Sequence, residues 1–453
     1  MGQVKYHFND ERLNSRAEMC FSEVLQNPLK DFPEVFKKSA DLEGFYRLLN
    51  NSEVFLDELQ KTIVEDTQAR IFASNLQKRD ILVLHDTTEI CPPKANSIPA
   101  FKKDGKFFTH LSLLTEIHPS QHIYGVGDIT MWPRSRGYKS ELIDDSKDDN
   151  EENRWWDQIA HINSLWPMHH LIHVMDQEAD ACKIWSNLQE TQCRFVIRLH
   201  HNRNVLLEDG TPSKLLEVIK DAPLKARLTI TLNERKLAEK APPRSKKRHP
   251  NRRTREARLQ VRASKVDICK TSQFHRNQDL GSVKINILHV FEDNKRKDKV
   301  DWLIMTSEPI ESEQDCLRLI HIYQSRWLVE EFFKGLKTGC RLEKRLFADE
   351  GAWYRLLLFL LPVVTKILNL RWLANQSKDP KLKELSEIQW KILSLNAHQN
   401  HREIENQNQA YAEIAHLGGH IKSNGPPGWM VLLRGFVELL NLEKGWKLAQ
   451  IKM

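Results

Sequence analysis

The chain has 453 residues and a formal net charge of +7; 40% of its residues are hydrophobic and 28% are charged. This composition is typical of a globular protein and excludes an intrinsically disordered chain. At about 100 to 200 residues per domain, the length predicts two to four domains.

The positive charge is concentrated in one segment, because residues 225–270 carry 16 Lys or Arg against 4 acidic residues. A local cationic field of this kind suits a polyanion such as DNA. On charge alone, a solvated basic loop is an equally good interpretation.

Membrane insertion and export are not indicated. The longest apolar run, residues 356–364, is far shorter than the ~20 residues that cross a bilayer. The N-terminus has no apolar signal core, so we expect a cytoplasmic protein with no membrane partner. The seven cysteines form no Cys-x-x-Cys pair, which argues against a zinc ribbon or a disulfide framework.

The first seventy residues have apolar residues at helical spacing. Asn9 or Asp10 is expected to cap the first helix, and another helix is expected after Asp41. The segment therefore predicts a compact helical module.

From about residue 80 the pattern changes to short apolar runs, which predict strands. The expected strands are 81–84, 107–117, 123–132, 171–175 and 195–199. Helices are expected at 155–165 and 178–192, and the acidic stretch 144–152 is expected to be a solvated loop. This order predicts the α/β class, with a mixed sheet covered by helices.

Residues 201–308 interrupt this pattern with alternating segments at 226–232, 259–266 and 283–290, which predict a β-rich insertion. From residue 311 onward the chain is expected to be helical, first over 311–338 and then over 353–373.

Two aspartates come directly after expected strands, Asp86 after the first and Asp176 after the fourth. One aspartate after a strand is usually a turn or cap residue. Two of them at the ends of neighbouring strands can instead hold Mg²⁺, which prefers a few carboxylates together with water and phosphate oxygens.

A third element is the spacing Tyr323-x2-Arg326-x3-Glu330-x6-Lys337. On one continuous helix, at about 100° per residue, these four residues share a stripe roughly 60° wide. Glu331 is rotated by about 100° from Glu330, so Glu330 is the better candidate for a functional carboxylate. By geometry alone, a solvated face with i,i+4 ion pairs is favoured.

Three strings carry a resemblance to a known family: His85-Asp86-Thr87-Thr88, Asp176-Gln177-Glu178-Ala179-Asp180 and the Tyr-Arg-Glu-Lys block. They resemble the signature blocks of bacterial insertion-sequence DDE transposases. The subgroup is the cut-and-paste one, with a β-rich insertion in a ribonuclease-H-like core. Residues 8–13 and 417–419 are similar to the family's N-terminal DNA-binding and C-terminal helical domains, so the resemblance covers essentially the whole chain. Leu328 departs from it, because the family more often has a polar or basic residue there.

The resemblance implies a catalytic triad, Asp86, Asp176 and Glu330, that binds two Mg²⁺ ions, for which Mn²⁺ can substitute. One ion would activate water or a 3′-hydroxyl and the other would stabilise the leaving oxygen. The implied DNA contacts are Tyr323, Arg326, Lys337, Arg198 and Trp302. Trp302 would stack on a base flipped out of the duplex, whereas its spacing alone slightly favours a core Trp that closes a sheet.

The resemblance also implies a function and a domain plan. The enzyme would cut out an insertion sequence through a DNA hairpin and join it to target DNA, as a homodimer bound to the inverted repeats. The implied domains are an N-terminal DNA-binding domain (1–70), a catalytic core in two parts (71–200 and 309–372), the insertion (201–308) and a C-terminal dimerisation domain (373–453).

Two alternatives stay open, a nuclease of the same fold without strand transfer and a non-catalytic DNA-binding protein. A further candidate is the group His169, His170 and His173, which has near-helical ligand spacing. It runs into an expected strand, so a structural or surface role is favoured over metal binding.

Overall fold

The computed structural model describes residues 4–73, 80–102, 105–120, 122–133, 151–166, 170–232, 234, 250–270, 281–375, 385–421 and 425–450. The chain forms two compact units. Unit 1 consists of Met1–Arg79, Asp86–Lys147 and Trp327–Met453, and unit 2 consists of Asp80–His85 and Asp148–Arg326.

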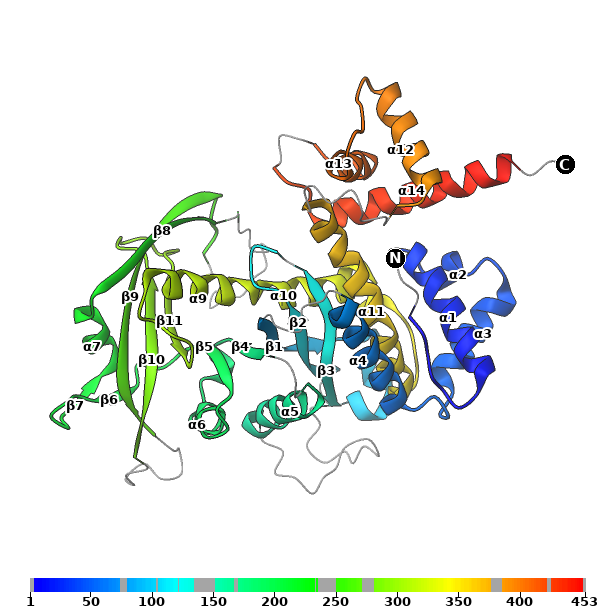
Figure 1. Ribbon diagram of the computed structural model, residues 1–453. Coiled ribbons are helices and arrows are strands. Elements are labelled where there is room, and N and C mark those ends of the chain that lie inside the picture. Colours follow the sequence, from blue (N-terminus) through cyan, green and yellow to red (C-terminus); the bar gives the residue numbers. More distant parts are fainter. Residues whose placement is uncertain are drawn as a thin grey trace. The chain divides into compact units, whose positions relative to one another are not determined.

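Unit 1 begins with helices, as the sequence predicts (Figure 1): α1 (Glu11–Gln26), α2 (Phe32–Val35), α3 (Ser39–Asn50) and α4 (Leu56–Ala73). Asp10 is the N-cap of α1, because its carboxylate accepts the N–H of Arg12 at 2.8 Å. Phe45 joins these helices to the core of the unit, with its ring 4.8 Å from Phe32 and 5.3 Å from Phe359 of α11.

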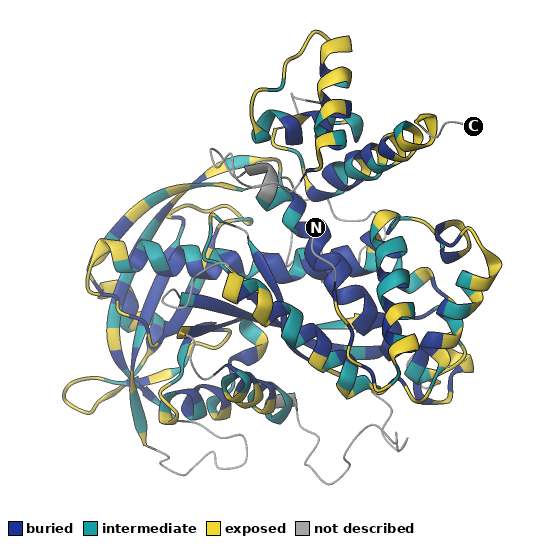
Figure 2. Ribbon diagram, turned by 45° about the vertical axis from the view of Figure 1, so that its right-hand side comes forward, coloured by how far each residue is buried: buried dark blue, intermediate teal, exposed yellow. Residues whose placement is uncertain are grey.

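The central helix of unit 1 is α11 (Glu350–Asn375), which contacts α4 and β3. Strands β2 (Phe107–Thr115) and β3 (Ile123–Pro133) pair antiparallel, and the short helices η1 (Ala95–Ser97) and η2 (Pro99–Phe101) precede them. By length and composition α11 could cross a bilayer over Glu350–Trp372, but 83% of that window is buried inside the protein. Its apolar side chains therefore belong to the core. Figure 2 colours the buried residues of the chain dark blue.

The C-terminal part of unit 1 is also helical: α12 (Glu387–Gln399), α13 (Gln407–Leu417) and α14 (Trp429–Ala449). Helices α13 and α14 cross with their backbones in close contact, because a Cβ atom at Gly435 would overlap the carbonyl oxygen of Ile414. Glycine is therefore required at this crossing.

Unit 2 is built on a sheet (Figure 1) that contains the first part of β1 (Asp80–Ile90). Within the unit the strand order is β1-β4-β5-β11-β10-β9-β6-β7, with β8 paired to β9. The other strands are β4 (His170–Met175), β5 (Arg194–Arg198), β6 (Asn204–Leu206), β7 (Pro212–Lys214), β8 (Leu224–Leu232), β9 (Arg255–Cys269), β10 (Ser282–Phe291) and β11 (Asp301–Thr306). The β1-β4 and β4-β5 pairs are parallel and the β5-β11 pair is antiparallel, so the sheet is mixed, as predicted.

The helices of unit 2 are α5 (Glu151–Leu165), η3 (Gln177–Ala179), α6 (Cys182–Glu190), α7 (Leu215–Asp221) and α9 (Glu313–Ser325). Trp155 of α5 and Trp185 of α6 are both 1% exposed and pack in one cluster with Ile197 of β5 and Ile287 of β10. The insertion therefore shares its hydrophobic core with β4, β5 and their helices. The expected β-rich character of residues 201–308 is confirmed by β6 to β11.

Two sequence expectations are wrong in detail. Asp86 does not end its strand, because β1 continues to Ile90. The helix expected over 311–338 is interrupted: α9 ends at Ser325, α10 (Trp327–Lys334) follows, and η4 (Gly335–Gly339) is a π-helical turn in which the N–H of Cys340 reaches the carbonyl of Gly335 at 2.8 Å. A π turn has more residues than an α turn, so the stripe calculated at 100° per residue does not extend to Lys337.

Some of the predicted segments lie outside the residues that the structure describes. The acidic residues 144–150 and all of residues 235–249 of the basic segment lie outside the described part of the chain. The two compact units combine parts of several of the five predicted domain ranges, which stay a prediction.

Candidate active site

Asp176 lies where the sequence predicts, immediately after β4. It is the N-cap of η3, and its Oδ1 accepts the N–H of Glu178 at 2.8 Å. This bond fixes the carboxylate at the C-terminal end of a parallel strand pair, since β4 runs beside β5 with Met175 opposite Ile197.

Unit 2 brings together five of the predicted site residues, four of them around the buried ring of the fifth, Tyr323, which is 6% exposed. Burial raises the pKa of the Tyr323 hydroxyl, the charges of Arg198 and Arg326 oppose that rise, and the carboxylate of Asp176 adds to it. The ring of Trp302 meets that of Tyr323 edge-on, with 5.3 Å between centroids. An aromatic pair, two arginines and a carboxylate therefore share one region of the unit.

Strand pairing positions the residues beside Tyr323. Arg198 is the last residue of β5, and its partner across the sheet is Ile304 of β11. Its Nη2 donates to the carbonyl of Asp301 at 3.3 Å, which directs the guanidinium along the start of β11. Trp302 is the second residue of that strand and is half-buried rather than enclosed in the core.

Unit 1 contains Asp86, Glu330 and Lys337. Lys337 donates from Nζ to Thr88 Oγ1 at 2.9 Å and lies 3.8 Å from Glu343. Lys337 is thus held against β1, two residues along the strand from Asp86. The carboxylate of Asp86 accepts the N–H of Thr87 at 2.9 Å.

The neighbouring glutamates of α10 have different surroundings. Glu330 is half-buried, and Glu331 forms an ion pair with Arg371 of α11 at 2.5 Å. Both side chains of that pair are mostly buried, 17% and 18% exposed. Glu331 therefore helps to hold α10 on α11, which leaves Glu330 as the candidate for chemistry on this helix.

Two buried histidines, His85 and His173, join β1 to β4 within unit 2. His85 Nε2 lies 2.9 Å from His173 Nδ1, and His173 Nε2 lies 3.2 Å from Asn163 Oδ1. Burial lowers the pKa of His173 to about 3, so the ring is neutral. This contact gives His173 a structural partner; His170 is exposed, and His169 lies outside the described residues.

The donor types suit a hard divalent cation, because all three predicted ligands are carboxylates. Among the described residues, however, no group of three or more His, Cys, Asp or Glu side chains is arranged so that it could hold a metal ion. Asp176 belongs to unit 2, and Asp86 and Glu330 belong to unit 1. The ligand set therefore stays a prediction.

Sequence reasoning missed the residues that hold the end of β4. Gln177 Nε2 donates to the carbonyl of Leu199 at 3.1 Å, and the buried carboxylate of Asp180 binds Arg203. The string that contains Gln177 and Asp180 was visible in the sequence. Its partner Arg203 was not, because only the fold shows that the segments after β4 and β5 lie together.

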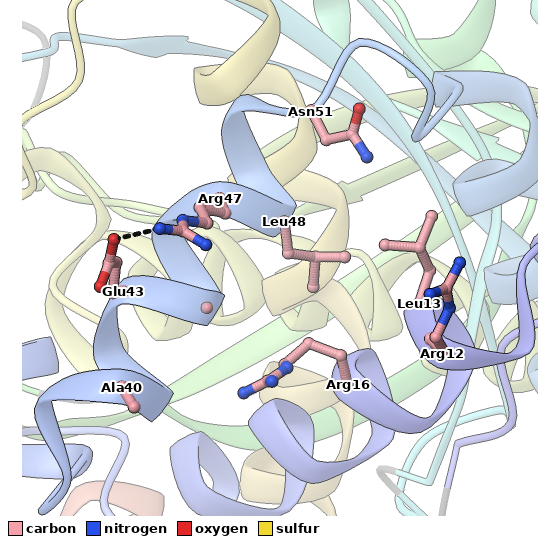
Figure 3. A pocket seen from close by; sticks show the side chains of 9 residues that line it. Arg12, Leu13, Arg16, Ala40, Glu43, Arg47, Leu48 and Asn51 are labelled. Carbon is pink, nitrogen blue, oxygen red and sulfur yellow. Dashed lines mark hydrogen bonds and ion pairs between the residues drawn. The ribbon is translucent and has the colours of Figure 1, made fainter.

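The N-terminal helices of unit 1 contain a groove of about 520 Å³ between α1 and α3. Figure 3 shows Arg12, Arg16 and Arg47 along it. Arg16 and Arg47 are paired, at 3.4 Å with Asp41 and at 2.5 Å with Glu43. Arg12 is paired as well, at 3.2 Å with Asp10, so all three guanidinium groups have a carboxylate partner.

Comparison with known families gives two matches. Residues 4–54 match the family described as "Transposase DNA-binding", and residues 141–361 match the family described as "Transposase DDE domain". Together the matches cover more than half of the chain. The second range contains Asp176 and Glu330 and begins after Asp86.

One solved structure among those found is the cryo-EM structure of the piggyBac transposase synaptic complex with hairpin DNA. It is 8% identical, and the alignment covers 98% of this chain and 73% of that one with a TM-score of 0.32.

The chain is a DDE transposase with an N-terminal transposase DNA-binding domain. The DDE domain makes it a metal-dependent enzyme of DNA strand cleavage and transesterification, with a ribonuclease-H-like core. The predicted fold class and enzyme class are thereby confirmed.

Proposed function

We propose that this transposase moves an insertion sequence by a cut-and-paste route, with cleavage, hairpin formation and strand transfer carried out at Asp86, Asp176 and Glu330. The observation that carries the proposal is the cluster around Tyr323 in unit 2. A buried aromatic ring, two arginines, a half-buried Trp and a carboxylate at a strand end suit a DNA strand whose phosphate is attacked next to a displaced base.

Strand register supports the pairing of the two aspartates. Leu84 of β1 pairs with Val174 of β4, and Asp86 and Asp176 each follow their paired residue by two positions. Glu330 supplies the third carboxylate from α10.

In the proposed site, Asp86, Asp176 and Glu330 hold divalent ions, with Mg²⁺ as the natural ion and Mn²⁺ as a substitute. Two bound ions supply activation of the attacking hydroxyl and charge neutralisation at the leaving oxygen. The residues of the chain orient the DNA: Tyr323, Arg326 and Lys337 bind phosphates near the transposon end. Arg198 is a further DNA contact, and Trp302 accepts the flipped base.

The proposed partners are the inverted repeats of the element and a target duplex, bound by a homodimer. The N-terminal DNA-binding domain and the basic segment of the insertion contribute contacts outside the active site. We place the enzyme in the cytoplasm, on the nucleoid when it binds DNA.

The test is incubation of the full chain with the inverted repeats that flank its own gene and with a target plasmid, in Mg²⁺. Nicked ends, hairpin ends and joined products are expected in that order. Cleavage without joining would identify a nuclease of the same fold, and binding without cleavage a non-catalytic DNA-binding protein.

A further inference from the structure

One polar contact near Asp176 in the sequence is a buried ion pair, Asp180 with Arg203, that the catalytic proposal does not use. Asp180 lies four residues after Asp176, and its side chain is 1% exposed. Arg203 lies five residues after Arg198, and its side chain is 10% exposed. The pair thus joins the segment after β4 to the segment after β5.

The Asp180 carboxylate has four donors. Oδ2 accepts the backbone N–H groups of His200 at 2.7 Å and His201 at 2.9 Å, and Oδ1 accepts Arg203 Nε at 2.8 Å and Nη2 at 2.5 Å. Arg203 Nη2 also donates to the Asp180 carbonyl at 2.5 Å. A buried charge with its hydrogen bonds satisfied in this way keeps one geometry, because every alternative leaves a donor or the carboxylate unpaired.

A further hydrogen bond joins the same two segments next to the predicted site residues Asp176 and Arg198. Gln177 donates to the carbonyl of Leu199, which directly follows Arg198. The guanidinium of Arg203 lies over the ring of Trp185, 5.7 Å from its centroid, which ties the pair to the hydrophobic core. Two links therefore join the turn after Asp176 to the chain after Arg198.

We propose that Asp180 and Arg203 are positioning residues that set the carboxylate of Asp176 and the guanidinium of Arg198 for metal and DNA. The inference rests on the proposed function, in which Asp176 is a metal ligand. Residues that orient ligands from behind in this way typically change metal affinity by about 10- to 100-fold when replaced.

The insertion offers a matched control. Glu292 is also a buried carboxylate that accepts two Arg255 nitrogens, at 2.6 and 2.8 Å, and one backbone N–H, from Val300 at 2.8 Å. Its side chain is 3% exposed, and that of Arg255 is 14% exposed. None of these hydrogen bonds involves the turn after Asp176, so Glu292→Gln measures the cost of removing a buried ion pair alone.

The experiment compares full-length Asp180→Asn and Glu292→Gln. Thermal unfolding gives the stability loss, titration calorimetry gives Mn²⁺ affinity, and cleavage of inverted-repeat DNA gives the Mg²⁺ concentration for half-maximal rate. Both variants should lose stability to a similar degree. Only Asp180→Asn should weaken Mn²⁺ binding and raise the Mg²⁺ requirement, each by about 10-fold or more. Equal metal affinity in the two variants would overturn the proposal.

Two further variants distinguish failure of the positioning role from failure of the proposed function. If Asp180→Asn does not fold, Arg203→Lys takes its place, because it keeps the charge and removes the paired donation from two nitrogens. Asp176→Ala tests the proposed function itself. If it binds Mn²⁺ as the wild type does, the assignment of Asp176 as a ligand fails; if it loses binding while Asp180→Asn keeps it, only the positioning role fails.

Discussion

The rings of Trp302 and Tyr323 meet edge-on at 5.3 Å, and they differ in exposure: Tyr323 is buried, whereas Trp302 is half-buried. Trp302 thus packs against Tyr323 and keeps part of its surface accessible to solvent. This arrangement fits a platform for a displaced base better than a Trp enclosed in the core.

Replacing Trp302 with Ala should leave first-strand nicking normal and impair hairpin formation. A sharply bent hairpin pushes a base out of the stack, and stacking on an aromatic ring offsets about 1 to 3 kcal/mol of that cost. Nicked and hairpin products are measured on the same labelled end, and 2-aminopurine fluorescence reports base flipping.

Trp185→Ala is the control for that experiment, because this Trp is 1% exposed and packs in the core. It should lower the melting temperature strongly. If Trp302→Ala lowers the melting temperature as much and reduces nicking as far as it reduces hairpins, Trp302 is a packing residue.

Replacing each of the two glutamates of α10 in turn should affect DNA cleavage in one variant and folding stability in the other. Glu330→Ala should abolish cleavage and leave binding to the inverted repeats intact, since in the proposed site the Glu330 carboxylate binds the metal. Glu331→Ala should retain cleavage and lose about 1 to 3 kcal/mol of unfolding free energy, because it leaves Arg371 without its charged partner. Urea unfolding and a cleavage time course measure both effects. The reverse pattern, with Glu331→Ala inactive and Glu330→Ala active, would exchange the two roles.

The basic segment 240–258 should supply phosphate contacts that do not depend on sequence. Of its described residues, Arg253 and Arg258 are exposed. Neutralising several of its Lys and Arg residues should flatten the slope of log affinity against log salt by about 0.9 for each phosphate that the variant no longer binds, with specificity little changed. Exposed Lys220 on α7 provides a control substitution. An unchanged slope would make the segment a solvated loop.

We expect the folded protein to lose stability in acid because His110 is held neutral in its buried site. This residue of β2 is 1% exposed, and burial lowers its pKa to about 3. In the unfolded chain a histidine takes up its proton near pH 6.5. The neutral folded ring therefore contributes stability above pH 6.5 that is lost as the pH falls toward 3, by up to about 1.4 kcal/mol per pH unit.

Urea unfolding of the wild type and of His110→Gln between pH 8 and pH 5 tests this effect. The variant should show a smaller decrease in unfolding free energy below pH 6.5. Identical pH dependence in both proteins would show that His110 is not the group responsible.

The sequence was sufficient where a local pattern decides the structure. The apolar runs that became β2 to β5 and the cap Asp10 were predicted because strand burial and helix capping depend on adjacent residues. The position of Asp176 directly after β4 was also predicted correctly, since it follows a run that is buried on both faces.

Longer-range features were not predictable in the same way. The end of α9 at Ser325 and the π turn at Gly335–Gly339 leave no mark in apolar spacing, so a uniform helix was assumed. Asp86 was expected at a strand end because it follows the apolar run that begins at Ile81, but the strand continues through it to Ile90. The contact of Asp180 with Arg203 depends on which two strands are neighbours, and a single sequence does not specify this.

The most direct test of the account is cleavage of the element's own inverted repeats in Mg²⁺ by the wild type and by Asp176→Ala. The wild type should nick and then join these ends to a target plasmid. Asp176→Ala should bind the same DNA with similar affinity and make no cut, because in the proposed site the Asp176 carboxylate binds the metal and does not contact the duplex. An Asp176→Ala protein that cuts the ends at the wild-type rate would contradict the account.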